Sequence, residues 1–396
     1  MPAVMDIRAH LPSAQIDWVV ERAFAPLLAV APSVNKVIAC DIRRWRKSWW
    51  THQTRREFMQ FKRQLQNDSY DAIIDLQGLS KSAFISWLAE LSPKGKRFAI
   101  GNQTQGASYE PMTRWVADTP VVVHTRVHAV ERSRIICSKA LNYAYLSQAE
   151  GVTSTPASPS ALHVKPAKAV QPQTIALVHA SSREDKTWPL SYWTELGEGL
   201  MQRGFQIALP QGSEDELEQA RKISNTLVGS KVWLKMSLDN VTAHLAACAG
   251  VIGVDSGLSH IAEALDLPLV QIYNFPTNWR TGPIRQAFQT STYAVPTPSV
   301  EDVLKKWDES WSLFQNLKDK AHQPIHSLPI QNEFIKPSVL NTSEAQISEL
   351  VDQSLLGSTS VLSSIESKNT SSTSKSNSKK NSAEASKPSP QLGLFD

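Results

Sequence analysis

The chain has 396 residues, of which 41% are hydrophobic and 20% are charged, and its formal net charge is +4. This length allows two domains with separate cores, and the composition is typical of a globular protein. The small net charge indicates no class of partner, and no apolar run reaches the roughly eighteen residues of a membrane-spanning helix. Cys40, Cys137 and Cys248 are widely spaced and form no Cys-x-x-Cys pair, which argues against a disulfide framework or structural zinc and favours a reducing cytosol.

Short apolar runs alternate with helical stretches through the first 150 residues. This alternation is typical of a parallel α/β sheet, in which helices connect buried strands. The segments predicted to be buried strands are Ile16 to Val20, Val37 to Ala39, Ala72 to Leu76 and Phe98 to Ile100. We therefore predict a first α/β domain over residues 1–150.

Between Gly151 and Gln173 the composition changes to Ser, Thr, Pro, Ala and Lys. Such a segment cannot bury much apolar surface and is typical of a linker. We therefore place the domain boundary here, with a linker over residues 151–173.

Strand and helix signals resume after the linker. The predicted strands are Thr174 to His179, Phe205 to Leu209, Val251 to Val254 and Leu269 to Tyr273, and helices are expected from Ser191, Glu214, Asp239 and Ser256. Two α/β domains joined by a linker are expected to face each other across a cleft. Because open parallel sheets bind ligands at the carboxyl ends of their strands, function is expected on those loops.

The C-terminal part of the chain shows weaker patterns. Periodicity is weak from Val303 to Leu340, and Thr342 or Ser343 could then cap a last helix with one apolar face. We extend the second domain to residues 174–356 to include this helix. Residues 357–396 are rich in Ser and Lys with few apolar groups, so we expect a disordered tail.

The segment GVDSGLSHIAEALDLPLVQIY contains a strand that ends at Val254, a polar turn and a helix. Free N–H groups of the first helical turn and the helix dipole make such a junction an anion site, and Gly257 would let a ligand approach the backbone. His260, one turn further on, could reach the same anion. Alternatively, Asp255 and Ser256 could simply cap the helix.

Two further loops carry polar side chains at strand-to-helix junctions. HASSREDKTWPL places Ser181, Ser182 and Lys186 after a predicted strand, where they could contact a phosphate. LPQGSEDELEQA places Glu216 in a first helical turn, where its carboxylate could accept hydrogen bonds from ribose hydroxyls or could only complement the helix dipole.

The motifs HASSREDKTWP, LPQGSEDE, KMSL and GVDSGLSH occur in the order seen in heptosyltransferases that use ADP-heptose, and the chain resembles this family. The resemblance implies a GT-B fold, with two Rossmann-like parallel-sheet domains facing a cleft, and metal-independent catalysis. It implies that the diphosphate contacts are Ser181, Ser182, Lys186, Asp255, Ser256, Gly257 and His260, that Glu216 contacts ribose, and that Met236 lines the adenine pocket. The sequence contains no Asp-x-Asp pair that could hold a cation against a diphosphate, so we expect no metal site and no cofactor.

The segment from Arg43 to Arg63, RRWRKSWWTHQTRREFMQFKR, mixes cationic and aromatic side chains densely. This mixture could bind single-stranded nucleic acid or anionic lipid, or could be a solvated helix face. IRRWRK, DLQGLSKSA and HAVERSR are each similar to motifs of the heptosyltransferase I group, whose acceptor is a Kdo-substituted lipid A. The acceptor contacts that this resemblance implies are Arg43, Arg46, Lys47, Gln77, Gly78 and Lys81.

Membrane contact is expected from the same segment. Trp45, Trp49 and Trp50 could seat the domain at the lipid interface, so we expect a cytoplasmic protein bound peripherally to the inner membrane. HAVERSR, from His128 to Arg134, is predicted to be helical and either packs the domains or reaches the acceptor.

The sequence departs from the family pattern in two places. Many members carry Arg in the segment before Glu-Pro, where this chain has Tyr109-Glu110-Pro111, so one acceptor cation is lost or replaced. Family members also begin with an apolar strand and a Gly-Asp loop ahead of the segment that matches Met1, and that Asp is the implied general base. We therefore expect the first strand to be missing and name no catalytic residue, since Asp6 falls on a helix that directs it away from a strand-end loop.

The last residues, Gln391 to Phe395, resemble the peptide by which bacterial polymerases and repair proteins dock on the sliding clamp. This makes the clamp a minority candidate as a partner.

Together these features predict an inverting transfer of heptose from ADP-heptose to the Kdo of lipid A in the lipopolysaccharide inner core. Two alternatives remain open. One is a heptosyltransferase II-type enzyme that uses the same donor, and the other is a non-catalytic sugar-nucleotide-binding protein.

Overall fold

The computed structural model describes residues 1–29, 33–145, 162, 164–181 and 183–322. The helix predicted from Thr342 or Ser343, the tail over 357–396 and the clamp-like peptide from Gln391 to Phe395 lie outside the described residues. None of the helices within the described ranges is long and apolar enough to cross a membrane.

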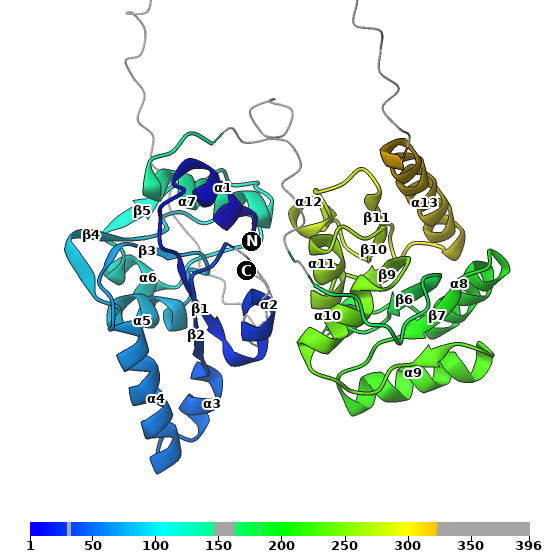
Figure 1. Cartoon of the computed structure of the whole chain (residues 1–396), viewed down its shortest axis with the longest axis horizontal. Coiled ribbons are helices and arrows are strands. Elements are labelled where there is room, and N and C mark those ends of the chain that lie inside the picture. The colour runs from blue at the N-terminus through cyan, green and yellow to red at the C-terminus, as the bar shows by residue number, and fades with distance from the viewer. Residues whose placement is uncertain (30–32, 146–161, 163, 182, 323–396) are drawn as a thin grey trace, which may run out of the picture. The chain divides into compact units, whose positions relative to one another are not determined.

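The N-terminal region builds two small parallel sheets (Figure 1). Strand β1 (Asp17–Glu21) pairs with β2 (Lys36–Cys40), and β3 (Tyr70–Asp75), β4 (Leu91–Ile100) and β5 (Thr119–Val121) form a three-stranded sheet in that order. The helices of this region are α1 (Pro2–His10), α2 (Ala25–Ala29), α3 (Ile42–Lys47), α4 (His52–Leu65), α5 (Ser80–Leu88), α6 (Pro111–Val116) and α7 (Ala129–Leu141).

Helix α1 is held against α7 by an ion pair. The Arg134 guanidinium donates two hydrogen bonds, of 2.6 Å and 2.8 Å, to the two carboxylate oxygens of Asp6. Both side chains are largely buried, so this charge pair is a packing contact between helices. The helix expected over HAVERSR is present as the start of α7, and Asp6 lies on a helix as expected.

The C-terminal region builds one six-stranded parallel sheet of order β11-β10-β9-β6-β7-β8. Its strands are β6 (Thr174–Val178), β7 (Gln206–Leu209), β8 (Lys231–Val232), β9 (Gly250–Val254), β10 (Leu269–Tyr273) and β11 (Gln289–Tyr293). The helices are α8 (Leu190–Gln202), α9 (Glu214–Thr226), α10 (Leu238–Ala246), α11 (Gly257–Ala264), α12 (Asn278–Thr281) and α13 (Val300–His322). The apolar strands β6, β9 and β10 are buried along their whole length, because helices cover both faces of the sheet.

The strand order reverses between β6 and β9. From β6 the chain proceeds outward to β7 and β8, and β9 then returns to the other side of β6 before β10 and β11 follow. In an open parallel sheet the loops on either side of such a switch point diverge and leave a ligand site at the carboxyl ends of the strands. The loops that follow β6 and β9 are those on which the sequence predicts the diphosphate contacts.

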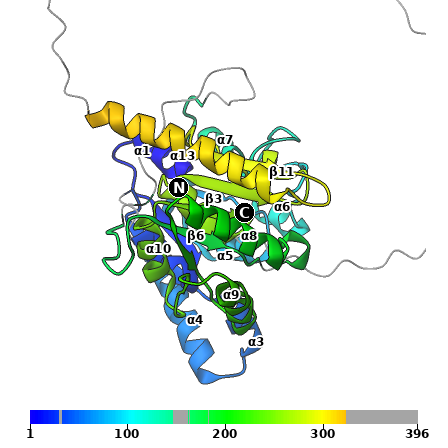
Figure 2. The same cartoon turned by 90° about the vertical axis from the view of Figure 1, so that its right-hand side faces the viewer.

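Helix α13 occupies a segment in which the sequence showed only weak periodicity after Val303. This 23-residue helix packs on α8, β10 and β11, and Figure 2 shows it running beside β11. Val303 and Trp307 are fully buried in its apolar face. The buried Ser310 of the same face donates to the Phe288 carbonyl oxygen, so the apolar pattern is interrupted by a polar residue that only tertiary structure satisfies.

The predicted linker is also corrected in its second half. Leu162 is buried, and Val164 and Val170 pack on the same cluster as strands β6 and β9 and helix α10. Ala167 donates a backbone hydrogen bond to Ala243 in α10. These described residues therefore bury apolar surface against the C-terminal sheet domain, contrary to the expectation from composition.

Candidate functional site

A charged triad lies at the switch point of the C-terminal sheet. The Lys186 Nζ, on the loop after β6, lies 2.7 Å from Asp255 Oδ2, on the loop after β9. The His260 Nε2, in the second turn of α11, lies 3.3 Å from Asp255 Oδ1. Each carboxylate oxygen of Asp255 therefore contacts one basic side chain. Asp255 thus holds Lys186 and His260 close together, although they come from two different segments of the chain.

The hydrogen bonds of the triad keep Asp255 and His260 charged at neutral pH. Burial opposes the charged form of Asp255, but hydrogen bonds from His260 and Lys186 outweigh it and lower the pKa of Asp255 to about 2. Burial likewise opposes the imidazolium of His260, but hydrogen bonds to Asp255 and Glu263 raise its pKa to about 9. His260 is therefore a cation beside the Lys186 ammonium, and two cationic side chains at one site suit an anion.

Glu263 is a residue of this site that the sequence analysis missed. The residue is 7% exposed, and its carboxylate lies 3.9 Å from His260 Nδ1 and accepts a hydrogen bond from the Ile284 N–H. The signal was available, because position 263 shares a helix face with position 260.

The first turn of α11 completes an anion-binding arrangement. Ser256 is the N-cap residue, yet within the described structure its hydroxyl makes no capping hydrogen bond and lies instead 3.5 Å from the Ser259 hydroxyl. The alternative that Ser256 merely caps the helix is therefore not what the geometry supports. The N–H groups that begin at Gly257 are available to an oxyanion close to the triad.

The loop after β7 positions Glu216. Ser213 caps α9 by accepting from the Glu216 N–H at 3.2 Å, and the Glu216 carboxylate accepts from the Gly212 N–H at 2.6 Å. The His179 Nε2 at the end of β6 lies 3.2 Å from the Glu216 carbonyl oxygen. One carboxylate oxygen of Glu216 thus stabilises the turn before α9, and the backbone of Glu216 contacts the residue that follows β6.

Two of the other predicted donor contacts, Ser181 and Met236, are described by the structure. Ser181 is half-buried and its hydroxyl accepts from the Arg183 N–H at 3.4 Å. Met236 is half-buried on the apolar cluster that includes Trp233 and Val241. Ser182 lies outside the described residues.

The predicted acceptor cations of α3 are exposed. Arg43, Arg46 and Lys47 make no hydrogen bond or ion pair with any described residue. The neighbouring Arg44 is different, since it pairs with Asp41 and Glu57. The three cations named from the sequence are thus the ones left free for an external anion.

Trp45 corrects the prediction that three tryptophans seat the domain on a membrane. It is only 2% exposed, packs on Phe58 and Phe61, and donates its indole N–H to Glu57 at 3.0 Å. Trp49 and Trp50 are 46% and 72% exposed. Only these two tryptophans of α3 and its following turn can contact a surface.

The loop after β3 is organised by Asp75. This buried carboxylate accepts hydrogen bonds from the N–H groups of Gln77 and Gly78 and from the Ser82 hydroxyl. Burial raises the pKa of Asp75, and these hydrogen bonds oppose that effect. Gly78 has a φ of 71°, a left-handed backbone conformation that glycine adopts without strain, so it is suited to the turn after β3. Gln77 is exposed at the carboxyl end of β3.

Arg43 and Lys81 share a neighbour that the sequence analysis did not single out. Glu21, the last residue of β1, lies 3.9 Å from Lys81 Nζ. Burial raises the pKa of Glu21, and the charges of Lys81 and Arg43 oppose that effect. Glu21 at the end of β1 is therefore within reach of the charges of two predicted acceptor cations, Lys81 after β3 and Arg43 in α3.

Residues 58–308 match the family described as glycosyltransferase family 9 (heptosyltransferase). Lipopolysaccharide heptosyltransferase 1 of Escherichia coli K12 is 34% identical over 286 residues, which are 70% of this chain and 83% of that protein. Lipopolysaccharide heptosyltransferase 2 of the same strain is 34% identical over only 94 residues, or 22% of this chain and 27% of that protein.

Solved structures of the E. coli heptosyltransferase WaaC are also similar. The structure with ADP superposes with a TM-score of 0.62 at 28% identity and covers 80% of this chain and 94% of that one. The structure with ADP-2-deoxy-2-fluoro heptose has a TM-score of 0.59 at 30% identity and covers 81% and 94%. These matches confirm the family resemblance and the α/β fold of parallel sheets predicted from the sequence.

Proposed function

Since the chain belongs to glycosyltransferase family 9, the heptosyltransferases, we propose that it transfers heptose from ADP-heptose to the Kdo of lipid A during assembly of the lipopolysaccharide inner core. The observation that carries this proposal is the triad of Lys186, Asp255 and His260 beside the first turn of α11. The names of its relatives, lipopolysaccharide heptosyltransferase 1, support the same reaction.

In this proposal the diphosphate of ADP-heptose binds at the switch point. Lys186 and protonated His260 contact its oxygens, the N–H groups from Ser256 and Gly257 complete the site, and Asp255 orients the two cations without touching the anion. The Ser181 and Ser182 hydroxyls add hydrogen bonds, Glu216 accepts from the ribose, and Met236 borders the adenine.

The proposed chemistry is a single displacement with inversion. An acceptor hydroxyl oxygen attacks the anomeric carbon from the face opposite the diphosphate, the bond from that carbon to the phosphate oxygen breaks, and its electron pair leaves with ADP. The hydroxyl proton passes to a general base. Lys186, His260 and α11 stabilise the charge that develops on the leaving group, and no metal ion or other cofactor takes part.

Asp6 does not serve as this base in the proposal. Its two carboxylate oxygens accept both hydrogen bonds of the Arg134 guanidinium, so the proton-accepting atoms face α7.

The proposed acceptor site lies on the N-terminal sheets. Arg43, Arg46 and Lys47 are the free cations of α3 and would bind phosphates and carboxylates of Kdo-lipid A, while Gln77, Gly78 and Lys81 border the end of β3. Exposed Trp49 and Trp50 beside these cations support peripheral binding to anionic lipid at the cytoplasmic face of the inner membrane.

Sequence identity over a similar aligned length supports the type I reaction over the type II alternative. Heptosyltransferase 1 of E. coli K12 is 34% identical over 286 residues, whereas lipooligosaccharide heptosyltransferase 2 of Haemophilus influenzae is 25% identical over 296 residues. A binding protein without catalysis is the other alternative. The clamp-like peptide from Gln391 to Phe395 lies outside the described residues and adds nothing to this choice.

A transfer assay tests the proposal. Purified protein is incubated with ADP-heptose and Kdo-lipid A, and the lipid is analysed by mass spectrometry while released ADP is counted. We expect one heptose per lipid, one ADP per transfer, and little ADP without acceptor. ADP-heptose binding by folded protein without any lipid product would support the non-catalytic alternative.

A further inference from the structure

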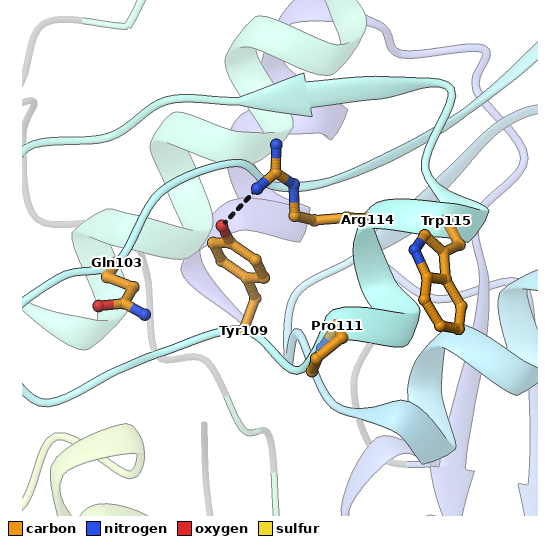
Figure 3. A pocket seen from close by; sticks show the side chains of 5 residues that line it. All are labelled: Gln103, Tyr109, Pro111, Arg114 and Trp115. Carbon is orange, nitrogen blue, oxygen red and sulfur yellow. Dashed lines mark hydrogen bonds between the residues drawn. The ribbon is translucent and has the colours of Figure 1, made fainter.

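An open hollow of about 740 Å³ lies in the N-terminal region, and none of its lining residues was assigned to the site described above. Its lining consists of Gln103, Tyr109, Pro111, Arg114 and Trp115, which come from helix α6 and the loop before it (Figure 3). Figure 3 shows Tyr109 and Arg114 side by side, with Gln103 and Trp115 on opposite sides of them. A cation, an aromatic platform and an amide thus converge on one concave surface.

Arg114 is held in place by Tyr109. Its Nη1 donates to the Tyr109 hydroxyl at 3.3 Å, and its guanidinium carbon lies 5.8 Å from the centre of the same ring. A hydrogen bond and a cation–π contact to one side chain restrict the orientations of the guanidinium. Most of its five N–H donors remain directed to the hollow or to solvent.

No described carboxylate balances the charge of Arg114. The nearest acid in sequence, Glu110, accepts from the Ser80 N–H at 2.6 Å, and this hydrogen bond together with that of the Ser80 side chain lowers the pKa of Glu110. Glu110 is thus committed to the start of α5. A positioned guanidinium without a carboxylate partner favours an external oxyanion, with which it can form a bidentate contact.

Trp115 indicates what carries that oxyanion. Its side chain is 83% exposed, and a large apolar ring at the rim of a hollow is typical of a surface that a ligand covers. An indole face packs well against the C–H face of a sugar ring, and the exposed Gln103 amide can both donate to and accept from hydroxyls. A guanidinium for a carboxylate, an indole for a sugar ring and an amide for hydroxyls together match an acidic sugar better than a bare anion.

The hollow adjoins the loop at the end of β3. Glu110 donates its backbone N–H to the Gly78 carbonyl oxygen at 2.8 Å, and a side-chain carbon on Gly78 would lie 3.4 Å from Tyr109 Cβ. The segment that carries Tyr109 is therefore fastened to the loop of Gln77 and Gly78. A ligand in the hollow would lie next to residues assigned above to the acceptor.

We propose that this hollow is a subsite for an acidic sugar of the acceptor, in which Arg114 binds the sugar carboxylate and Trp115 stacks on the ring. The inference rests on the proposed function for the identity of the acceptor. It also explains the departure at Tyr109, where many family members carry Arg. In this chain Tyr109 positions the guanidinium of Arg114, five residues later in the sequence.

Direct binding tests the subsite without catalysis. The methyl glycoside of Kdo is titrated into the full-length protein by calorimetry, beside its carboxyl methyl ester, mannose and inorganic phosphate. We expect Arg114→Gln to weaken binding of the free acid about tenfold, Arg114→Lys to weaken it less, and the ester to bind wild type as weakly as the acid binds Arg114→Gln. The matched control is Arg221→Gln, which removes an exposed charge from α9 and should leave binding unchanged.

Trp115 supplies a second signal. Binding of the acid should quench tryptophan fluorescence in wild type and not in Trp115→Phe, and because Trp115 is exposed this variant should fold normally. Equal affinity of wild type and Arg114→Gln for the acid, or equal affinity of wild type for acid and ester, would overturn the subsite. So would competition by phosphate without any binding of the acid.

Transfer kinetics separate this inference from the proposed function. If the subsite is real, Arg114→Gln raises the KM for Kdo-lipid A with little change in kcat. Normal transfer by Arg114→Gln with an unchanged KM would overturn the subsite and leave the transferase intact. Absence of transfer by folded wild type that still binds the Kdo glycoside through Arg114 would overturn the transferase and leave the subsite.

Discussion

The Lys186 ammonium lies 2.7 Å from the Asp255 carboxylate, although 69 residues separate the two in sequence. The parallel pairing of β6 with β9 places the loops that carry them side by side. Asp255 also holds His260, so one buried carboxylate fixes the positions of two cations at the end of the sheet. The leaving diphosphate would meet charges that are already in place, and such preorganisation is a main source of catalysis in group transfer.

Replacement of Lys186 by Met should lower kcat about a hundred- to a thousandfold, since one donor to the developing charge is lost. Heptose transfer is measured at saturating donor and acceptor. Lys222→Met, which removes an exposed lysine paired with Glu218 on α9, is the matched control and should keep wild-type kcat. Equal kcat in the two variants would show that Lys186 does not act on the leaving group.

The raised pKa of His260 predicts a loss of stability at alkaline pH. The ordinary pKa of a histidine is 6.5 and that of His260 in the folded protein is about 9, so its stabilisation is complete below pH 6.5 and disappears as pH rises through 9. Asp255, with its pKa lowered from 3.8 to about 2, contributes above pH 3.8 and loses its contribution only as pH falls through 2.

Thermal unfolding followed from pH 6 to pH 10 measures the His260 effect. The melting temperature of wild type should fall more steeply between about pH 7 and pH 9 than that of His260→Gln, which lacks the titrating group. Parallel curves for the two proteins would contradict the assignment of this transition to His260.

Asp6→Asn tests whether this carboxylate has only a structural role. The variant breaks the ion pair with Arg134 and leaves a partly buried guanidinium without its counter-charge, so the free energy of unfolding should drop by roughly 3 kcal/mol. Urea unfolding measures this loss. Transfer per folded molecule should change less than threefold, and a drop of a hundredfold or more would identify Asp6 as the base instead.

Binding to anionic vesicles should depend on the free cations of α3. The double variant Arg46→Gln with Lys47→Gln should weaken binding to vesicles rich in phosphatidylglycerol by roughly 2 kcal/mol, or about thirtyfold. Co-sedimentation measures the effect. Arg44→Gln, at a cation already paired with Asp41 and Glu57, should change binding less, and equal losses in both variants would reduce the contact to nonspecific charge.

Alanine variants of Trp45 and Trp50 should differ in what they impair, one the stability of the fold and the other the binding to membranes. Trp50→Ala should weaken vesicle binding at unchanged stability, because Trp50 is exposed. Trp45→Ala should lower the free energy of unfolding by about 3–5 kcal/mol, because it empties a buried site. A stable Trp45→Ala protein with weakened vesicle binding would restore the original prediction for Trp45.

Much of the fold was predictable because buried parallel strands leave apolar runs that a single sequence displays. β6, β9 and β10 lie within one residue of the predicted segments, and the junction at Asp255 to Gly257 is a strand end followed by a helix as expected. Strand β5 was missed because it has three residues, one of them a proline. Helix α13 was missed because polar Ser310 lies on its buried face.

Residue roles were less predictable than elements. The burial of Trp45 depends on Glu57 and Phe61 of the next helix, and a tryptophan among cations looks the same whether it faces lipid or a core. The pairing of Lys186 with Asp255 depends on strand order, which no local pattern contains. Arg114 escaped notice because its significance comes from the hollow around it.

The most direct test of the central claim compares two acceptors with one donor. ADP-heptose is supplied with Kdo-lipid A and, in parallel, with Kdo-lipid A that already carries one heptose, and kcat/KM is measured for each. The account predicts transfer to the first acceptor and at least a hundredfold slower transfer to the second. Transfer to the heptosylated acceptor alone would contradict it and assign the chain to the type II reaction.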